Sequence, residues 1–260
     1  MIKAIFFDID GTLVSFKTHT IPQSTIDAVR EVRKRGVKVF IATGRPMPFI
    51  NNLEGLEYDG IMSVTGAHFV DGDGKVIFSH PVPKDDIRRV LDYASAKRMC
   101  VTFAGADETF TIYPNQQSDE VFRLLNLQPS VAHGASEHCL DMDVLQVIAF
   151  FTADEEEEMM RDVLSQCDAH RWHPAFADCI ASGISKATGM DEVIKHYGID
   201  ISETMAFGDG GNDIEMLCHA GVGIAMGNAN DNVKKCANIV TDSVDDHGVA
   251  KILAKFDKFL

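Results

Sequence analysis

The sequence predicts an α/β protein whose core is a parallel β-sheet interrupted by an inserted α+β domain. Apolar strands alternate with amphipathic helices over the first sixty residues, which is typical of βαβ units and therefore of parallel sheets. From about Pro81 to Ser182 strands pair with helices without long crossovers. After Ser182 strands and helices alternate again, as in the first sixty residues. We therefore expect a discontinuous core of residues 1–81 and 183–260, with an inserted domain at 82–182.

The first half of the core is assigned from apolar runs, from apolar residues at helical spacing, and from glycines that mark helix ends and turns. The opening run is continuously apolar, as in a strand buried on both faces. A helical pattern ends at Gly36, and an Asp-Gly-Asp-Gly turn divides the last apolar stretch into a hairpin. The expected elements are strands at 2–7, 37–42 and 60–64, a helix at 22–35 and a hairpin at 67–79.

The insert and the second half of the core are assigned on the same criteria. In the insert we expect helices at 84–98, at 118–126 and from Asp154 onward, with strands at 99–104, 109–113, 144–151 and on either side of Trp172-His173-Pro174. In the second half of the core we expect helices at 186–197, 211–218, 230–236 and 246–257, with strands at 204–207, 222–225 and 238–240.

Composition limits the classes of partner and compartment. With 260 residues, of which 45% are hydrophobic, the chain can build substantial cores. The net charge of -15 argues against nucleic acid or an anionic membrane surface as a partner. The six cysteines are widely spaced and form no Cys-x-x-Cys pair, and no apolar stretch approaches the length of a spanning helix. These features predict reduced thiols and a cytoplasmic location.

The first candidate site is the pair of carboxylates Asp8 and Asp10, directly after the strand at 2–7. Carboxylates this close repel each other unless a cation or a shared proton compensates them. The pair therefore predicts a metal-assisted nucleophile with an acid/base partner. A simple Asp/Gly turn is the alternative interpretation.

Two further positions carry polar groups suited to phosphate. The strand at 37–42 ends in Thr43-Gly44-Arg45. The Thr43 hydroxyl and the Arg45 guanidinium can each bind a phosphate oxygen, and Gly44 lets the backbone come close enough to do the same. Lys186 opens a helix after the insert, where the partial positive charge of the helix N-terminus makes lysine unfavourable. Such a local conflict often marks function, although a plain turn and a solvated lysine remain alternatives.

The strand at 204–207 ends in Gly208-Asp209-Gly210-Gly211-Asn212-Asp213. Asp209 and Asp213 lie four residues apart at a helix start, which places hard oxygen ligands on one face; a helix cap is the alternative. Ligands of open parallel sheets bind beyond the carboxyl ends of the strands. We therefore expect Asp8, Thr43 and Asp209 to project into one crevice.

These four motifs, in this order, resemble those of the haloacid dehalogenase superfamily. The insert after the second motif resembles that of the Cof-type, subclass IIB phosphatases, and the resemblance covers essentially the whole chain. It implies a Rossmann-like parallel-sheet core with an inserted α+β cap domain. It also implies an enzyme, a phosphoric monoester hydrolase that uses Mg²⁺ and an aspartyl-phosphate to hydrolyse small phosphorylated metabolites, such as sugar or nucleotide phosphates.

The chemistry of the residues and the resemblance agree on their roles. Asp8 is the expected nucleophile, Asp10 the acid/base, and Lys186 a third catalytic residue. The expected Mg²⁺ ligands are Asp8, the backbone of Asp10, Asp209 and Asp213, the last being either a ligand or an orienter of Lys186. The expected phosphate-binding residues are Asp10, Thr43, Gly44, Arg45, Lys186 and Asn212.

Two alternatives and two departures accompany this assignment. A phosphotransferase or phosphomutase would use the same residues, and a non-catalytic sugar-phosphate-binding regulator could retain them. Thr65-Gly66-Ala67 stands where the family commonly has Asn-Gly-Ala. The residues before Lys186 lack the second lysine of the family's Pro-Lys-Gly-type turn.

Overall fold

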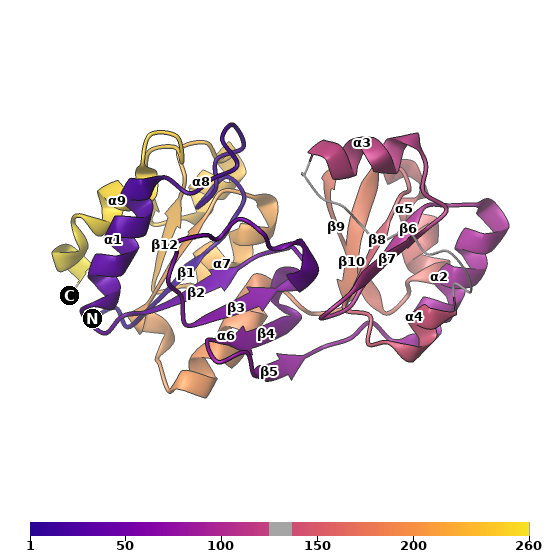
Figure 1. Cartoon of the computed structure of the whole chain (residues 1–260), viewed down its shortest axis with the longest axis horizontal. Coiled ribbons are helices and arrows are strands. Elements are labelled where there is room, and N and C mark those ends of the chain that lie inside the picture. Colours follow the sequence, from indigo (N-terminus) through magenta and orange to yellow (C-terminus); the bar gives the residue numbers. More distant parts are fainter. Residues whose placement is uncertain (125–136, 260) are drawn as a thin grey trace. The chain divides into compact units, whose positions relative to one another are not determined.

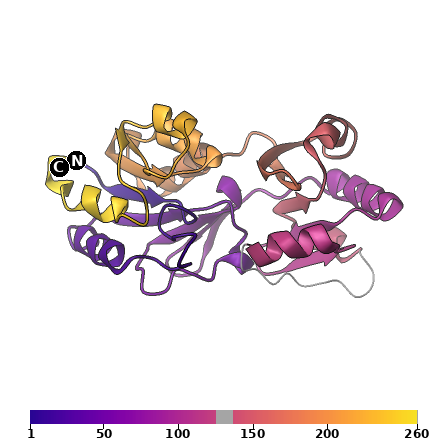
Figure 2. The ribbon, with the colours of Figure 1, turned by 90° about the horizontal axis from the view of Figure 1, so that it is seen from above.

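The computed structural model describes residues 1–124 and 137–259, and the chain divides into two compact units. The first unit comprises Met1–Arg45, Ile50–Phe78 and Ser185–Leu260, and the second comprises Pro46–Phe49 and Ser79–Ile184. In Figures 1 and 2 the indigo N-terminal segments and the orange to yellow C-terminal segments lie together in the first unit. The first unit is therefore discontinuous in sequence.

The first unit contains one eight-stranded sheet. Its strands are β1 (Ala4–Phe7), β2 (Lys38–Ala42), β3 (Gly60–Ser63), β4 (His68–Asp71), β5 (Val76–Ser79), β11 (Thr204–Gly208), β12 (Val222–Ala225) and β13 (Ile239–Val240). They follow the order β13-β12-β11-β1-β2-β3-β4-β5. Neighbours from β13 to β3 are parallel, and β4 pairs antiparallel with β3. The expected parallel core is confirmed, and its antiparallel edge is the expected hairpin.

The register of the central strands places their carboxyl ends at one edge. Phe7 of β1 pairs with Ile41 of β2 and with Phe207 of β11. Because the three strands are parallel and in step, the chain leaves each of them at the same edge of the sheet. This is the edge at which open α/β sheets bind ligands.

Helices cover both faces of this sheet. Ala4 and Phe6 of β1 join a buried cluster with residues of α6 and α7, so Ile5 and Phe7 face the opposite side. Helices α1 and α9 contact each other and lie side by side in Figure 1. The helices are α1 (Gln23–Arg33), α6 (Lys186–Tyr197), α7 (Ile214–His219), α8 (Asp231–Cys236) and α9 (Gly248–Leu253), with 3-10 turns at Val64–Gly66, Ile201–Glu203, Gly211–Asp213 and Phe256–Phe259.

The second unit contains a five-stranded sheet in the order β7-β6-β8-β10-β9, and its pairings are antiparallel. The strands are β6 (Val101–Ala104), β7 (Thr109–Ile112), β8 (Gln146–Ala149), β9 (Cys167–His173) and β10 (Phe176–Ala181). The helices are α2 (Lys84–Lys97), α3 (Gln116–Leu124), α4 (His138–Asp141) and α5 (Glu156–Glu158), with a 3-10 turn at Met47–Phe49. This is the expected α+β composition. The helix expected at 118–126 begins two residues earlier, and its residues 125 and 126 lie outside the described part.

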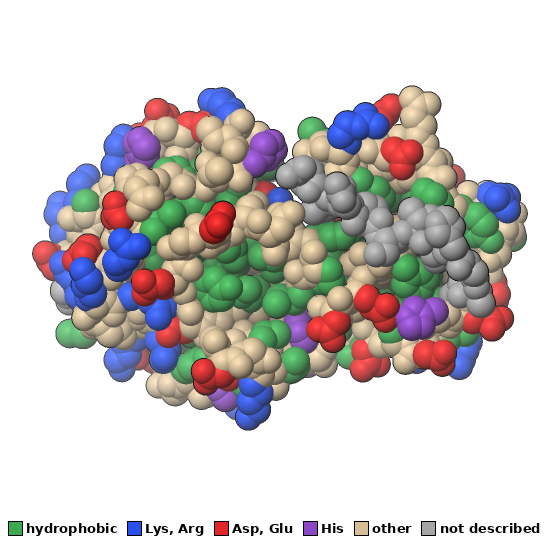
Figure 3. Space-filling model, viewed as in Figure 1, with side chains coloured by type: hydrophobic (Ala, Val, Ile, Leu, Met, Phe, Trp, Pro, Cys, Tyr) green, Lys and Arg blue, Asp and Glu red, His purple; other side chains and the backbone are tan. Residues whose placement is uncertain are grey.

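Charged side chains of both signs are mixed on the surface. On the face shown in Figure 3, Lys and Arg side chains are interspersed with Asp and Glu, as is usual for a solvated surface. Within residues 1–124 and 137–259, no helix is long and apolar enough to span a bilayer.

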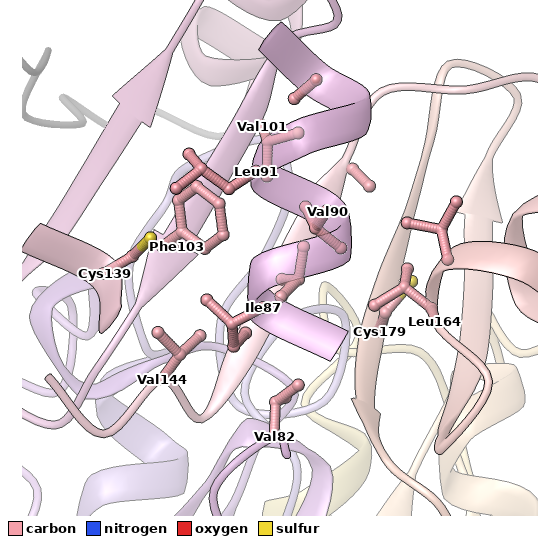
Figure 4. Close-up of a cluster of buried hydrophobic side chains, with 14 of the residues drawn as sticks. Val82, Ile87, Val90, Leu91, Val101, Phe103, Cys139, Val144, Leu164 and Cys179 are labelled. Atoms are coloured by element: carbon pink, nitrogen blue, oxygen red, sulfur yellow. The ribbon is translucent and has the colours of Figure 1, made fainter. Parts of the chain in front are cut away.

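The second unit has its own hydrophobic core. Ile87, Val90 and Leu91 of α2 point toward the sheet and pack in one buried cluster with Phe103 of β6 and Cys179 of β10 (Figure 4). These positions recur at helical spacing on α2, which is how an amphipathic helix covers one face of a sheet.

The acidic segment from Asp154 differs from the continuous helix expected there. It consists of a 3-10 turn (Ala153–Glu155), the single turn of α5 and a π-helical turn (Met159–Val163). Glu155 and Glu158 lie three residues apart, a spacing at which like charges repel each other in a regular helix. Met159 and Val163 are the buried residues of the π turn, so the segment still packs apolar side chains inward despite its irregular winding.

Candidate active site

The loop after β1 brings Asp8 to the edge of the sheet. Asp8 is buried, with 6% of its surface exposed. Its backbone N–H donates to the carbonyl oxygen of Phe207 at 3.0 Å, which holds this loop against β11. Gly11 has a φ of +85°, and a Cβ there would lie 2.2 Å from Oδ2 of Asp209. Only glycine lets this loop pass so close to Asp209.

The loop after β11 holds Asp213 with its own backbone. Asp213 is fully buried, and its Oδ2 accepts hydrogen bonds from the N–H groups of Asp209 (3.0 Å) and Gly210 (2.8 Å). Carboxylate oxygens of Asp8, Asp209 and Asp213 all lie within 4.8 Å of one another. The structure thus brings together the carboxylates of two motifs that are about two hundred residues apart.

Lys186, the first residue of α6, completes the buried cluster. Its side chain is fully buried, and Nζ lies 2.7 Å from Oδ1 of Asp8 and 2.6 Å from Oδ1 of Asp213. These ion pairs offset the unfavourable position of a lysine at a helix N-terminus. They also provide the pairing that a buried ammonium group requires.

The loop after β3 positions the start of α6. Gly66 has a φ of +101°, and a Cβ there would lie 2.2 Å from the carbonyl oxygen of Ser185, the N-cap of α6. Glycine therefore allows the helix that carries Lys186 to begin against this loop. Thr65, just before Gly66, is buried with a φ of 52°. This left-handed conformation is uncommon for a β-branched residue.

The Thr43-Gly44-Arg45 loop faces both the Asp10 side chain and Asn212. Arg45 forms a two-pronged ion pair with Asp10, with Nε 2.7 Å from Oδ2 and Nη2 2.7 Å from Oδ1. The Arg45 N–H donates to Oγ1 of Thr43 at 3.1 Å. A Cβ on Gly44 would lie 3.1 Å from Nδ2 of Asn212. All predicted site residues therefore lie at this edge of the first unit, and Arg45 contacts the candidate acid/base.

Two residues at the site are absent from the sequence prediction. Thr12 Oγ1 donates to Oδ1 of Asp209 at 3.1 Å, and Asn228 Nδ2 donates to Oδ2 of Asp209 at 3.0 Å. Thr12 stands four residues after Asp8 in the sequence, and this short separation is a signal that it lies near the site. Asn228 lies in a loop beyond β12, and no local pattern distinguishes it from a turn residue.

Burial and charge shift the ionisation of this cluster. Burial, reinforced by Asp213, raises the pKa of Asp8 well above its ordinary value despite the opposing effect of Lys186. The same two causes raise the pKa of Asp209 to about 7. Burial alone would lower the pKa of Lys186, but the charges of Asp213 and Asp8 outweigh it and the pKa is raised. Lys186 therefore stays charged at neutral pH.

The cluster fits a divalent cation. When all three carboxylates are ionised, they exceed the one ammonium group by two negative charges. Clustered carboxylate oxygens are the ligands that Mg²⁺ prefers in proteins. Burial is the main cause of the raised pKa values of Asp8 and Asp209, and a bound cation would offset the carboxylate repulsion that adds to it.

Comparison with known proteins identifies the family. Residues 5–253 match the haloacid dehalogenase-like hydrolase family. YkrA of Bacillus subtilis (strain 168) is 35% identical over 250 residues, which are 95% of this chain and 95% of YkrA. The chain spans only 52% and 46% of two longer relatives.

Solved structures agree with this assignment. The subclass IIB sugar phosphatase BT4131 has a TM-score of 0.89 and 39% identity, over 99% of this chain and all of that chain. BT1666 from Bacteroides thetaiotaomicron, described among the phosphatases of the same superfamily, has a TM-score of 0.90 and 37% identity, over 99% and 96% of the two chains. The chain therefore belongs to the haloacid dehalogenase-like hydrolases and has their Rossmann-like core with an inserted cap, as its four motifs predict.

Proposed function

We propose that this protein is a Mg²⁺-dependent phosphatase that hydrolyses small phosphomonoesters, sugar or nucleotide phosphates, through an aspartyl-phosphate on Asp8. The observation that carries the proposal is the contact of the buried Asp8 with Lys186, beside Asp209 and Asp213. The sugar phosphatase BT4131, which shares the fold, supports the substrate class.

Asp8, the backbone of Asp10 and Asp209 are the proposed Mg²⁺ ligands. Asp213 is proposed to orient Lys186 instead, because its Oδ2 already accepts two backbone N–H groups and its Oδ1 accepts from Lys186. When bound, Mg²⁺ supplies positive charge that compensates the excess carboxylates and polarises a phosphate oxygen.

In the first step an oxygen of Asp8 attacks phosphorus, and the bond from phosphorus to the ester oxygen breaks. Asp10 gives its proton to that leaving oxygen. Lys186, Thr43 and Asn212 would surround the remaining phosphate oxygens, where negative charge is concentrated. In the second step water attacks the phosphorus of the aspartyl-phosphate and gives a proton to Asp10. Inorganic phosphate leaves, and the Asp8 carboxylate is restored.

Arg45 has to exchange partners in this scheme. Its guanidinium holds the Asp10 carboxylate at two points, whereas Asp10 needs freedom to reach the leaving oxygen. Phosphate is an equally good two-point acceptor for arginine. We therefore propose that substrate phosphate draws Arg45 away and frees Asp10.

The proposed role of the inserted domain at 82–182 is to select the leaving group. It interrupts the chain between the second and third motifs, so it can vary without altering them. Deleting these residues should lower discrimination among sugar phosphates while p-nitrophenyl phosphate is still hydrolysed. An unchanged substrate profile in a folded deletion variant would refute this role.

The function itself is tested with a panel of phosphorylated metabolites, scored by kcat/KM with Mg²⁺ and with EDTA. Release of inorganic phosphate only in the presence of Mg²⁺ is the expected result. An isomerised sugar phosphate as the product would identify a phosphomutase instead. Binding of Mg²⁺ and phosphate without turnover of any substrate, including p-nitrophenyl phosphate, would identify a binding protein.

A further inference from the structure

Asn228 connects four loops at the carboxyl edge of the first unit's sheet. It lies between β12 and α8, and its Nδ2 donates to the Gly11 carbonyl oxygen (2.9 Å) and to Oδ2 of Asp209 (3.0 Å). Its Oδ1 accepts from the N–H of Val244 at 3.0 Å, in the segment after β13. Two acceptors on one side and a donor on the other fix the orientation of the amide. The loops after β1, β11, β12 and β13 therefore meet at this side chain.

The Asp209 carboxylate is held from both sides as a result. Oδ1 accepts from Thr12 and Oδ2 accepts from Asn228. The absence of a side chain at Gly11 leaves just enough room for Oδ2, since a Cβ there would lie 2.2 Å away. Each carboxylate oxygen has two lone pairs, so each keeps one for a cation while the hydrogen bonds prevent rotation.

We infer that Asn228 is a positioning residue of the metal site, an inference that rests on the proposed Mg²⁺-dependent function. By holding Asp209 to the loop that carries Asp8 and Asp10, it fixes the distance between ligands from two distant motifs. Hydrogen-bond partners of metal ligands commonly control metal affinity in this way. Asn228 is solvent-exposed, so in its absence water can replace its hydrogen bonds without a large loss of stability. Water cannot, however, hold the two loops together.

Asn230 provides a matched control. It is an exposed asparagine in the same loop, two residues further along. Its side chain makes no capping hydrogen bond to α8, and none to any other residue in the part of the chain that the structure describes. Asn230→Ala therefore removes an equivalent side chain without touching Asp209.

The test is calorimetric titration of Mg²⁺ into the full-length protein without substrate, together with thermal unfolding in EDTA. Asn228→Ala should weaken Mg²⁺ binding about tenfold or more, whereas Asn230→Ala should change it by less than about twofold. Both variants should unfold in EDTA within a few degrees of the wild type. Should Asn228→Ala fail to fold, Asn228→Ser also removes the amide and serves in its place.

The possible results separate this inference from the proposed function. Equal Mg²⁺ affinity of the wild type and Asn228→Ala would overturn the positioning role and leave the phosphatase proposal standing. If Asn228→Ala lowers the unfolding temperature in EDTA and weakens Mg²⁺ binding to a matching degree, the weaker binding reflects a less stable fold, and this too would overturn the positioning role. A wild type that binds no Mg²⁺ would overturn both this inference and the metal dependence.

Discussion

The ionisable residues of the site depend on one another because each is buried beside another charge. Lys186 compensates only part of the negative charge of Asp8, Asp209 and Asp213, and Asp10 is compensated separately by Arg45. A change at any of these residues therefore alters charge balance as well as chemistry.

Asp10→Asn should separate the two chemical steps. The asparagine cannot take a proton from water, so we expect steady-state turnover to fall about 10²- to 10⁴-fold. p-Nitrophenolate needs little protonation to leave, so a burst of about one product per enzyme should remain with p-nitrophenyl phosphate. Stopped-flow absorbance measures both phases, and calorimetry should show Mg²⁺ binding intact because the proposed ligand is the backbone. Wild-type steady-state turnover would exclude Asp10 as the acid/base.

Asp209 should make the stability of the metal-free protein depend on pH. Its pKa is raised from 3.8 to about 7 by burial and by Asp213, so between these values the folded state holds a proton that the unfolded chain has lost. Its contribution to the free energy of unfolding is then full below about pH 4 and declines as the pH rises toward 7. Denaturant unfolding of the wild type and Asp209→Asn in metal-free buffer measures this. A difference between the two that does not change with pH would contradict the shift.

The sequence is sufficient to bring Asp8, Thr43 and Asp209 to one edge, because parallel strands in register end together. It does not predict the pairing of Arg45 with Asp10, which depends on side-chain conformations in two loops. Nor does it predict Asn228, whose importance arises only from the approach of other loops. Contacts made by loops of different strands lie beyond local patterns.

Among the elements, α2 illustrates a polar contact that joins a helix to the sheet it covers. Asp86, in the first turn of α2, is fully buried. It accepts hydrogen bonds from the N–H (2.9 Å) and Nε2 (3.0 Å) of Gln166 and pairs with Arg89. Asp86 therefore ties the start of α2 to the turn before β9. A sequence pattern assigns such an aspartate to the solvent-facing first turn of a helix, so this role becomes visible only in the structure.

Asp86→Ala should destabilise the second unit by about 1–3 kcal/mol, because it removes the hydrogen bonds that the buried carboxylate accepts from Gln166 and its ion pair with Arg89. Asp85→Ala is the matched control, since Asp85 also pairs with an arginine three residues on but is 73% exposed. Asp85→Ala should lower the free energy of unfolding by less than about 1 kcal/mol. Urea unfolding monitored by circular dichroism measures both. Equal losses would show that the buried contacts of Asp86 contribute nothing.

For the whole molecule, the two units carry different kinds of cysteine. The buried thiols Cys100, Cys139, Cys167 and Cys179 all lie in the second unit, whereas the exposed Cys218 and the half-buried Cys236 lie in the first. All six are free. Burial raises the pKa of Cys100 and of Cys139 to about 11, which keeps them as unreactive thiols. Thiol chemistry can thus report on each unit separately.

In the native protein, Ellman's reagent should react at pH 8 with Cys218 and more slowly with Cys236. The four buried thiols of the second unit should react only when that unit unfolds and exposes them. Asp86→Ala should accelerate labelling of these four and leave the Cys218 rate unchanged. Mass spectrometry of labelled peptides over time distinguishes the sites. Rapid labelling of Cys100 or Cys139 in the folded wild type would contradict the burial described for the second unit.

The central claim is that Asp8, buried among charges from distant parts of the chain, becomes covalently phosphorylated. Its most direct test is acid quenching of the enzyme during turnover with Mg²⁺ and substrate, followed by mass spectrometry of the N-terminal peptide. We predict phosphate on Asp8 in the wild type and more of it in Asp10→Asn. Asp8→Asn should carry none and lose at least about a thousandfold in turnover. Near wild-type turnover by Asp8→Asn, or phosphate on another residue, would contradict the account.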